Sequence, residues 1–386
     1  MNETFKSEYG GFEQGPIRPP SEARSLLIRL TRNCPWNRCT FCPVYKDAVF
    51  SIRPTEHVKR DIDAVHAHIL KLDELAAASG GLSRDAIQRA LHGVAPEERP
   101  AFDAALSWYM SGMRSVFLQD ANSLFAKNVD LVEILLHLHG RFRGIQRVTS
   151  YARAQTVAKR TENELREIAN AGLNRIHIGL ESGSDKVLQM VRKGVTKQEH
   201  IDAGRKVIQA GIELSEYVMP GLGGKTLWEE HAIETADALN QIDPHFIRLR
   251  TLAIPSRVPL YDDYVSGRFQ KCTEPMIARE IMLFIERLGG ISSIIKSDHV
   301  LNLFGDLEGT LPADKPQMVA MLRSFLDLDP ERQTLYQVGR RCGVFTRLPD
   351  LNDPALCATA QAIRDQYGIT VENAEAVIEE IMRTFI

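Results

Sequence analysis

The fold is decided by a repeated unit whose clearest copy is TENELREIANAGLNRIHIGLESGS, residues 161–184. Thr161 and Glu164 have the spacing of a capping box, in which each side chain accepts a hydrogen bond from the other residue's backbone N–H. Gly172 suits the left-handed position that follows many helices, and the apolar segment after it is typical of a strand. The stretch therefore predicts a helix, a glycine stop, a strand over 174–180 and a polar loop that begins at Glu181.

The same unit recurs along the chain. Thr196-x-x-Glu199 and Thr226-x-x-Glu229 also match capping boxes, and Gly211 ends the first of these two predicted helices. A further helix is predicted over 129–142. Counting the strand already described, six strands are predicted: RSLLIRLT (24–31), RSVFLQ (114–119), IQRVTS (145–150), NRIHIGL (174–180), IELSEYVM (212–219) and FIRLRTLA (246–253).

Strands and helices that alternate about every 30 to 40 residues favour an α/β fold with a parallel sheet. Six such strands suit a partial (βα)6 TIM-like barrel or an open α/β sheet, and in both architectures ligands bind at the carboxyl ends of the strands. Polar or glycine-rich segments follow these predicted ends. They are the cysteine loop after the first strand, then Asp120–Asn122, Tyr151–Arg153, Glu181–Ser184, Pro220–Gly224 and Ile254–Pro255.

The composition is that of an ordinary globular protein. The chain has 386 residues, 44% hydrophobic and 25% charged, with a formal net charge of −3 and a pI near 6.4. This charge gives no general attraction to nucleic acid or to a membrane surface. No apolar run approaches the roughly 18 residues of a spanning helix, and the polar N-terminus does not match a signal peptide. We expect a cytoplasmic protein with reduced thiols.

Three of the six cysteines fall in TRNCPWNRCTFCP, residues 31–43, with the spacing C-x4-C-x2-C. Thiolates bind zinc and iron–sulfur clusters. A tetrahedral zinc site and a four-cysteine iron–sulfur site each need four ligands, and this loop supplies three. A structural zinc site with a distant histidine such as His57 remains an alternative. The other cysteines stand singly, which is typical of small buried side chains: they are Cys272, Cys342 and Cys357.

In these motifs the chain resembles the radical S-adenosylmethionine (SAM) superfamily, in the branch with oxygen-independent coproporphyrinogen oxidases, methylthiotransferases and the Elongator catalytic subunit. The resemblance covers about residues 15–300 and rests on GPIRPPSEARSLLIRLTRNCPWNRCTFC, GLESGSDKVL and SDHVLNLF. It implies that Cys34, Cys39 and Cys42 hold a [4Fe–4S] cluster whose fourth iron binds SAM. The superfamily's usual spacing is C-x3-C-x2-C, so this loop has one extra residue.

The resemblance also implies positions that bind SAM. Phe41 would lie beside the adenine, as would the glycine run that contains Gly221. Within the Asp120–Asn122 loop, Asp120 and Asn122 would meet the methionyl amino group, although an Asx turn explains the same residues. Glu181 would bind the ribose or the amino group of SAM, and a surface salt bridge is the alternative role for this residue. Lys193 would pair with the methionyl carboxylate, and Arg192 is the alternative residue for that contact.

Substrate-contacting residues are predicted less directly. Arg248 and Arg250 alternate within the sixth strand and would point to one side. If that side is the barrel interior, both need anionic partners such as a substrate carboxylate or phosphate; the alternative is that both charges face outward, toward helices or solvent. Tyr151 and Arg153 follow the third strand. His299 follows a possible last strand.

Outside the barrel, residues 54–112 read as a helical insertion with helices opening at Thr55 and over 96–110. We expect residues 1–300 to form the barrel and residues 301–386 a helical C-terminal extension, with helices over 315–328 and 373–386. This tail lacks a four-cysteine pattern and an RNA-binding β-domain, which argues against a nucleic-acid partner.

The function expected is that of a radical SAM oxidoreductase or lyase acting on a small molecule. It would receive one electron at a time from an external reductant of the flavodoxin or ferredoxin type. Two alternatives stay open: a radical methyl- or methylthio-transferase, and a non-enzymatic iron–sulfur or zinc module.

Overall fold

The computed structural model describes residues 8–383. The chain divides into two compact units, and its path crosses between them several times, once within the cysteine loop and twice within a strand. The first unit comprises the chain up to Pro35, residues 47–177 and residues 206–213; the second comprises residues 36–46, 178–205 and the chain from Leu214 onward.

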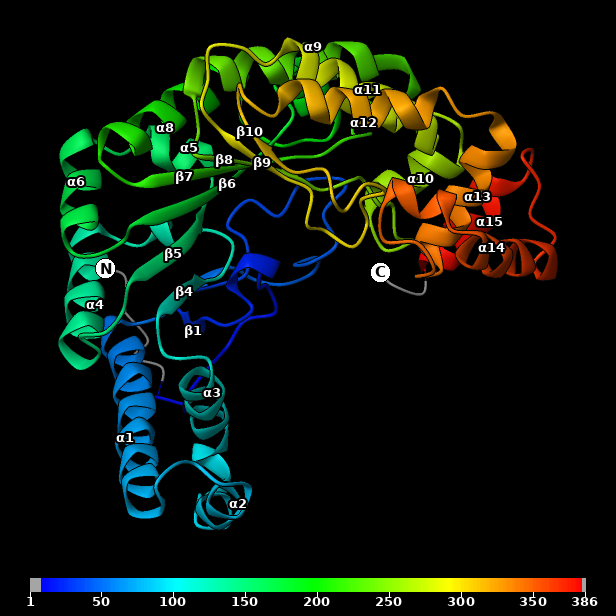
Figure 1. Ribbon diagram of the computed structural model, residues 1–386. Coiled ribbons are helices and arrows are strands. Elements are labelled where there is room, and N and C mark those ends of the chain that lie inside the picture. The colour runs from blue at the N-terminus through cyan, green and yellow to red at the C-terminus, as the bar shows by residue number, and fades with distance from the viewer. Residues whose placement is uncertain (1–7, 384–386) are drawn as a thin grey trace. The chain divides into compact units, whose positions relative to one another are not determined.

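The first unit is built around three parallel strands (Figure 1): β1 (Leu26–Arg29), β4 (Ser115–Gln119) and β5 (Arg147–Ala152). Leu26 pairs with Val116 and Ser115 with Arg147, so β1 and β5 both pair in parallel with β4. All five residues of β4 are buried, as expected for a central parallel strand. The short strands β2 (Thr31–Arg32) and β3 (Ser51–Ile52) pair antiparallel beside the cysteine loop.

Helices cover these strands and extend beyond them. The insertion forms α1 (Thr55–Ser79), α2 (Arg84–His92) and α3 (Arg99–Met110), so the helix starts predicted at Thr55 and within 96–110 are confirmed. Figure 1 shows α2 at the end of the α1–α3 pair that lies away from the strands. The other helices of this unit are α4 (Asn128–Arg141), α5 (Ala154–Ala158) and α6 (Glu162–Asn170), with short 3-10 turns at Pro20–Glu22, Pro96–Glu98 and Ser123–Phe125.

The second unit continues the α/β alternation and ends in helices. Its strands follow the order β6 (Arg175–Glu181), β7 (Glu213–Val218), β8 (Phe246–Leu249), β9 (Ile294–Lys296) and β10 (Gly309–Thr310). β7, β8 and β9 pair in parallel, and β10 is antiparallel to β9. Its helices are α7 (Asp185–Met190), α8 (Lys197–Gln209), α9 (Gly224–Ile242), α10 (Pro259–Val265) and α11 (Glu274–Arg287).

The C-terminal helices are α12 (Lys315–Leu326), α13 (Pro330–Arg341), α14 (Pro354–Gln366) and α15 (Ala374–Arg383), with a 3-10 turn at Leu348–Asn352. Helices α12, α13 and α14 share one apolar core with the strands of this unit, whereas α15 packs in a smaller cluster with Val338 of α13. Helices α9, α11 and α12 run side by side (Figure 1). Phe304 and Phe325 meet edge to face at 5.2 Å, and Tyr336 stacks on Phe345 at 6.2 Å, which joins the tail to this core.

The structure confirms an α/β fold with a mostly parallel sheet and a helical C-terminal tail. The capping box at Thr161 is present, and Gly172 and Gly211 have φ of +113° and +79°, the left-handed conformation expected of them. The capping box predicted at Thr226 is wrong: α9 already begins at Gly224, so Thr226 lies in its first turn. None of the helices in the described part of the chain is long and apolar enough to cross a membrane.

Candidate functional site

The cysteine loop begins in the first unit at a residue in the left-handed conformation. Asn33 has a φ of +68°, and its side chain donates to the carbonyl of Val49 at 2.6 Å. Its backbone N–H donates to Oδ2 of Asp120 at 2.9 Å. The fully buried Asp120 thus fixes the peptide that directly precedes Cys34.

Asp120 is held from the strand side by Arg29. The Arg29 Nε and Nη2 atoms donate to the same carboxylate oxygen at 2.9 and 2.6 Å. Burial raises the pKa of Asp120, and the Asn33 N–H and Arg29 act against that rise. Gly15 passes so close that a Cβ placed on it would lie 1.8 Å from Asp120 Oδ1. Asp120 therefore anchors the loop, while its predicted contact with the SAM amino group stays a prediction.

Asn122 ties two strand ends to each other. Its Nδ2 donates to Thr156 Oγ1 at 2.8 Å, and its Oδ1 accepts from the N–H of Arg153 at 3.2 Å. The side chain is fully buried. Both ends of the carboxamide are thus occupied within the protein, and a role toward SAM is an untested prediction.

In the second unit, the middle of the cysteine loop is fixed by backbone bonds on two sides. The Thr40 N–H donates to the carbonyl of Val191, and the Thr40 carbonyl accepts from Leu260, both at 3.0 Å. The Trp36 indole donates to the carbonyl of Arg192 at 2.8 Å. Gly194 has a φ of +69°, and a Cβ on it would lie 2.2 Å from the Trp36 ring. Only glycine fits at this position, which explains the glycine of VRKGVT.

Cys39 and Phe41 are buried in an apolar cluster that covers this part of the loop. Cys42 and Trp36 are partly buried against the same cluster. Its other members come from helices and strand ends: Val187, Val191, Met219, Leu222, Leu252, Ile254, Val258, Leu260 and Phe269. An apolar shell restricts water around thiolate ligands and so tunes the potential of any cluster they hold.

Two predicted SAM-binding residues form an ion pair beside this cluster. Lys193 Nζ donates to Glu181 Oε1 at 3.0 Å, and the same ammonium lies 5.8 Å from the centre of the Phe41 ring. Glu181 has a φ of +62°, a strained conformation for a residue with a Cβ. A Cβ on Gly179 would lie 2.4 Å from Glu181 Oε1, so the glycine makes room for this carboxylate. The structure thus brings together Phe41, Glu181 and Lys193.

Gly221 is held by a carboxylate that the sequence gave no reason to select. Gly221 has a φ of +86°, and its N–H donates to Oε1 of Glu280 at 2.8 Å. Burial raises the pKa of Glu280 to about 8, and the Gly221 N–H opposes that rise. The imidazole of His231 lies 3.4 Å from Glu280 Oε1 and also meets Ser182 Oγ at 2.8 Å. Burial lowers the pKa of His231 to about 4, so the ring is neutral near pH 7.

Glu216 is a second carboxylate that sequence reasoning missed. It lies fully buried in the middle of β7, and burial raises its pKa well above the usual value. The charge of Lys193 opposes this rise and that of Glu181 adds to it. The signal was available in the sequence, since a glutamate inside the predicted strand IELSEYVM is unusual for a buried parallel strand.

The predicted substrate residues have partners within the protein. Arg248 is buried and pairs with Asp298 at 2.7 Å, so its anionic partner is a side chain of this chain. Arg250 is exposed. Burial and the nearby Arg250 lower the pKa of His299 to about 4, which keeps this histidine neutral. These positions remain predictions as substrate contacts.

Comparison with protein families identifies the central part of this arrangement. Residues 104–236 match the family model of the radical SAM superfamily. The chain carries a radical SAM domain. Enzymes with this domain use a [4Fe–4S] cluster and SAM, the two cofactors expected from the sequence. The matched segment begins within α3, in the last part of the helical insertion, and so does not include the cysteine loop, which leaves Cys34, Cys39 and Cys42 as predicted ligands.

More distant likenesses extend over larger parts of the chain. A tRNA uridine(34) acetyltransferase of Methanocaldococcus infernus is 19% identical over 277 residues, which are 67% of this chain and 48% of that protein. The chain thus spans about half the length of this curated relative. Among solved structures, coproporphyrinogen III oxidase HemN from Escherichia coli has a TM-score of 0.44 and 13% identity, covering 68% of this chain and 52% of its own.

Another solved structure is that of the radical SAM methyltransferase TsrM from Kitasatospora setae with cobalamin and a [4Fe–4S] cluster bound. It has a TM-score of 0.42 and 16% identity, covering 63% of this chain and 37% of TsrM.

The residues around the radical SAM domain fit its cofactors. Three cysteines stand within nine positions of one loop, which gives three thiolates and leaves one iron for another ligand. An aromatic ring, a lysine and a glutamate lie together beside the two later cysteines. Thiolate, ammonium and carboxylate are the groups required to hold a cluster and the zwitterionic end of SAM.

Proposed function

We propose that this protein is a radical SAM enzyme that generates a 5′-deoxyadenosyl radical and abstracts a hydrogen atom from a small substrate. Cys34, Cys39 and Cys42 hold the [4Fe–4S] cluster. When bound and reduced, the cluster supplies one electron to the sulfonium of SAM, whose C–S bond breaks into methionine and the 5′-deoxyadenosyl radical. The observation that carries the proposal is the ion pair of Glu181 and Lys193 beside Phe41, next to the cysteine loop.

The side chains around the loop divide the work of binding. Asp120 and Arg29 fix the backbone that leads into Cys34. The Lys193 ammonium pairs with the methionyl carboxylate, and the Glu181 carboxylate accepts from the methionyl ammonium. When SAM binds, its methionyl carboxylate takes the place of Glu181 beside Lys193, and its methionyl ammonium takes the place of Lys193 beside Glu181. Each side chain therefore keeps a partner of opposite charge.

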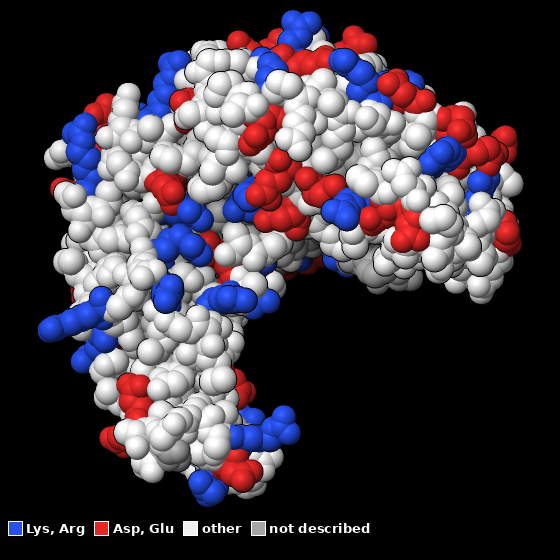
Figure 2. Space-filling view, in the orientation of Figure 1, with Lys and Arg blue, Asp and Glu red and all other residues white. Residues whose placement is uncertain are grey.

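Charge distribution supports a small-molecule substrate. Figure 2 shows side chains of both signs, Lys and Arg as well as Asp and Glu, on the face that it displays. Nucleic-acid binding requires neutralisation of many phosphates by clustered basic side chains, and the net charge of −3 does not favour it. An external one-electron reductant completes the reaction, as radical SAM enzymes generally require.

The test is cluster binding by the full chain and its cysteine variants. The protein is reconstituted with iron and sulfide without oxygen, reduced with dithionite, and examined by iron analysis and electron paramagnetic resonance with and without SAM. We expect about four irons per chain, as a [4Fe–4S] cluster requires, and a reduced-cluster signal that changes when SAM is added. Cys39→Ala loses both, whereas Cys342→Ala, at the end of α13, keeps both.

Two results would oppose the proposal. Zinc bound with no iron would assign the loop to a structural metal. A SAM-dependent formation of S-adenosylhomocysteine would assign the enzyme to methyl transfer rather than to hydrogen abstraction alone.

A further inference from the structure

The cysteine loop has one residue more than the spacing usual in the superfamily, and the structure shows how the extra length is accommodated. Asn37, between the first two cysteines, has a φ of +45°, the left-handed conformation that Asn adopts more readily than most residues. Its side chain donates to the carbonyl of Tyr45, a buried residue. The loop therefore bends at Asn37 and is tied there to the segment that follows the last cysteine.

Lys46 fixes the same bend. Its ammonium donates to the carbonyl of Cys39 at 2.8 Å and to that of Asn37 at 3.4 Å. The side chain is half-buried. Among the described residues, no Asp or Glu lies within ion-pair distance of it. A positive charge that is bonded only to carbonyl oxygens is thus held against the backbone of a predicted cluster ligand.

The Lys46 charge lies close to the sulfur of Cys39. The carbonyl oxygen and the Sγ atom of a cysteine are four bonds apart, so Lys46 Nζ lies within about 8 Å of this Sγ. Salt screens exposed charges over a length of about 8 Å at physiological ionic strength, and it screens partly buried charges less. The ammonium therefore acts on the group that the Cys39 thiolate would hold.

We propose that Lys46 is a positioning residue that shapes the widened loop and raises the reduction potential of the cluster. The inference rests on the proposed function, because it requires Cys39 to be a cluster ligand. One-electron reduction adds a negative charge to a cluster that thiolates already surround, and a nearby ammonium stabilises this reduced form. Lys46 thereby favours electron entry from the external reductant.

This charge offsets the effect of the apolar surroundings. Cys39 is buried and packs in one cluster with Phe41, and such surroundings disfavour the more negative, reduced form. Arg38 is the other cation of residues 36–46, but it is exposed and lies over the ring of Trp36 at 5.1 Å. Solvent screens the Arg38 charge, so Lys46 is the cation of this segment that compensates the burial.

The test is a potentiometric titration of the full chain. The protein is reconstituted without oxygen and reduced stepwise with dithionite and redox mediators, without SAM, and electron paramagnetic resonance gives the reduced fraction. Lys46→Gln and Lys46→Met should load iron nearly normally. At a fixed potential their ratio of reduced to oxidised cluster should be about tenfold lower, a shift of about 59 mV for a one-electron couple. Lys46→Arg keeps the charge and should stay near the native potential.

Lys206 supplies a matched control. Its ammonium also donates to two backbone carbonyls, those of Ala158 at 2.6 Å and Arg160 at 3.1 Å, outside the cysteine loop. Lys206→Gln loses the same kind of bonds and should keep the native potential. Unfolding temperatures of the variants show that each one is folded.

Three results would overturn the inference. Lys46→Gln and Lys46→Met could keep the native potential, or Lys46→Arg could shift as far as they do. Loss of iron from both charge-free variants would make Lys46 a structural anchor alone. The proposed function fails by a different result, a native chain whose reduced cluster leaves SAM intact, so the two failures can be told apart.

Discussion

At the residue scale, the buried Asp120 shows how a predicted cofactor ligand can have a structural role. The sequence placed Asp120 at a strand end, and the position is right. Only the structure could show that Arg29 and the Asn33 N–H occupy one of its oxygens, because these residues are distant in sequence. Asp120 therefore holds the backbone that leads into Cys34.

Replacing Asp120 with Asn should destabilise the protein and impair cluster loading. Arg29, which is largely buried, would keep its ion pair with Glu13 but lose its charged bonds to Asp120, which should cost about 1–3 kcal/mol. Urea denaturation and iron content measure the two effects. Asp103→Asn, in an exposed pair with Arg99, is the control and should change stability by well under 1 kcal/mol. Equal effects of both variants would contradict the anchoring role.

Lys193 and Glu181 were predicted from the sequence as separate contacts, and their pairing with each other was not. Lys193→Gln should weaken SAM binding about tenfold or more while iron loading stays near normal, because the lysine lies beside the loop without being a cluster ligand. Equilibrium binding of SAM to the reconstituted protein measures this. The control is Lys186→Gln, which should bind SAM normally, because the mostly exposed Lys186 ammonium pairs with Glu230. Unchanged SAM binding by Lys193→Gln would remove Lys193 from the site.

At the element scale, helices and strands with strong local signals could be predicted and those set by tertiary contacts could not. The six predicted strands are present as β1 and β4–β8; one predicted helix begins at Thr55, and another begins directly after its capping residue Thr161. β8 ends at Leu249, four residues before the end of the strand predicted over 246–253. The start of α9 at Gly224 was missed because glycines carry no capping signal.

The contact of α11 and α9 with the Gly221 loop gives a pH-dependent stability. Glu280 has a pKa of about 8 in the folded protein against an ordinary value of 4.5, so the folded state holds its proton over that range. Stability from this group is complete below about pH 4.5 and is lost as the pH rises to about 8. The pKa of His231 is lowered to about 4, so this residue makes the stability rise with pH, but only up to its ordinary pKa of 6.5.

Between pH 6.5 and 8, therefore, the ionisation of Glu280 still lowers the stability of the folded protein, whereas His231 no longer contributes to the pH dependence. Glu280→Gln keeps an oxygen for the Gly221 N–H and should reduce the loss of stability over this interval, by up to about 1.4 kcal/mol per pH unit. Urea denaturation at pH 6.5 and 8 gives the difference between variant and native chain. The same slope in both would show that Glu280 does not titrate there.

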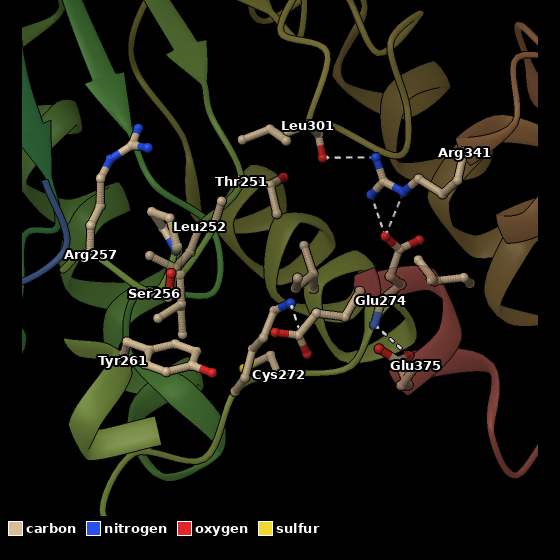
Figure 3. A pocket seen from close by; sticks show the side chains of 17 residues that line it. Thr251, Leu252, Ser256, Arg257, Tyr261, Cys272, Glu274, Leu301, Arg341 and Glu375 are labelled. Atoms are coloured by element: carbon tan, nitrogen blue, oxygen red, sulfur yellow. Dashed lines mark hydrogen bonds and ion pairs between the residues drawn. The ribbon is translucent and has the colours of Figure 1, made fainter. Parts of the chain in front are cut away.

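At the scale of the whole molecule, the C-terminal helices could be predicted as helices, but their contribution to the core could not. Apolar periodicity shows that a helix has a buried face and does not show which surface covers it. The cavity of about 250 Å³ beside α15 (Figure 3) could not be predicted for the same reason. Its walls come from residues 251–257, 261, 271–277, 301, 341 and 375–379, and no pattern in the sequence joins these segments.

The stacked pair of Tyr336 and Phe345 tests whether the tail belongs to the core of the second unit. Both rings are fully buried in the cluster that also contains residues of α9 and α11. Phe345→Ala should lower the free energy of unfolding by about 3–5 kcal/mol through the cavity it leaves. Tyr367→Ala, at an exposed ring, should cost far less. A loss below about 1 kcal/mol for Phe345→Ala would mean that the tail folds independently of this core.

The central claim is that this chain cleaves SAM reductively, and one product tests it directly. Anaerobically reconstituted protein is reduced with dithionite, mixed with SAM, and its products are separated and identified by mass. We predict 5′-deoxyadenosine and methionine in equal amounts, formed by the native chain and by Cys342→Ala and absent from Cys34→Ala, Cys39→Ala and Cys42→Ala. Formation of 5′-deoxyadenosine that is unchanged in the three cysteine variants, or none from a fully loaded and reduced native chain, would contradict the account.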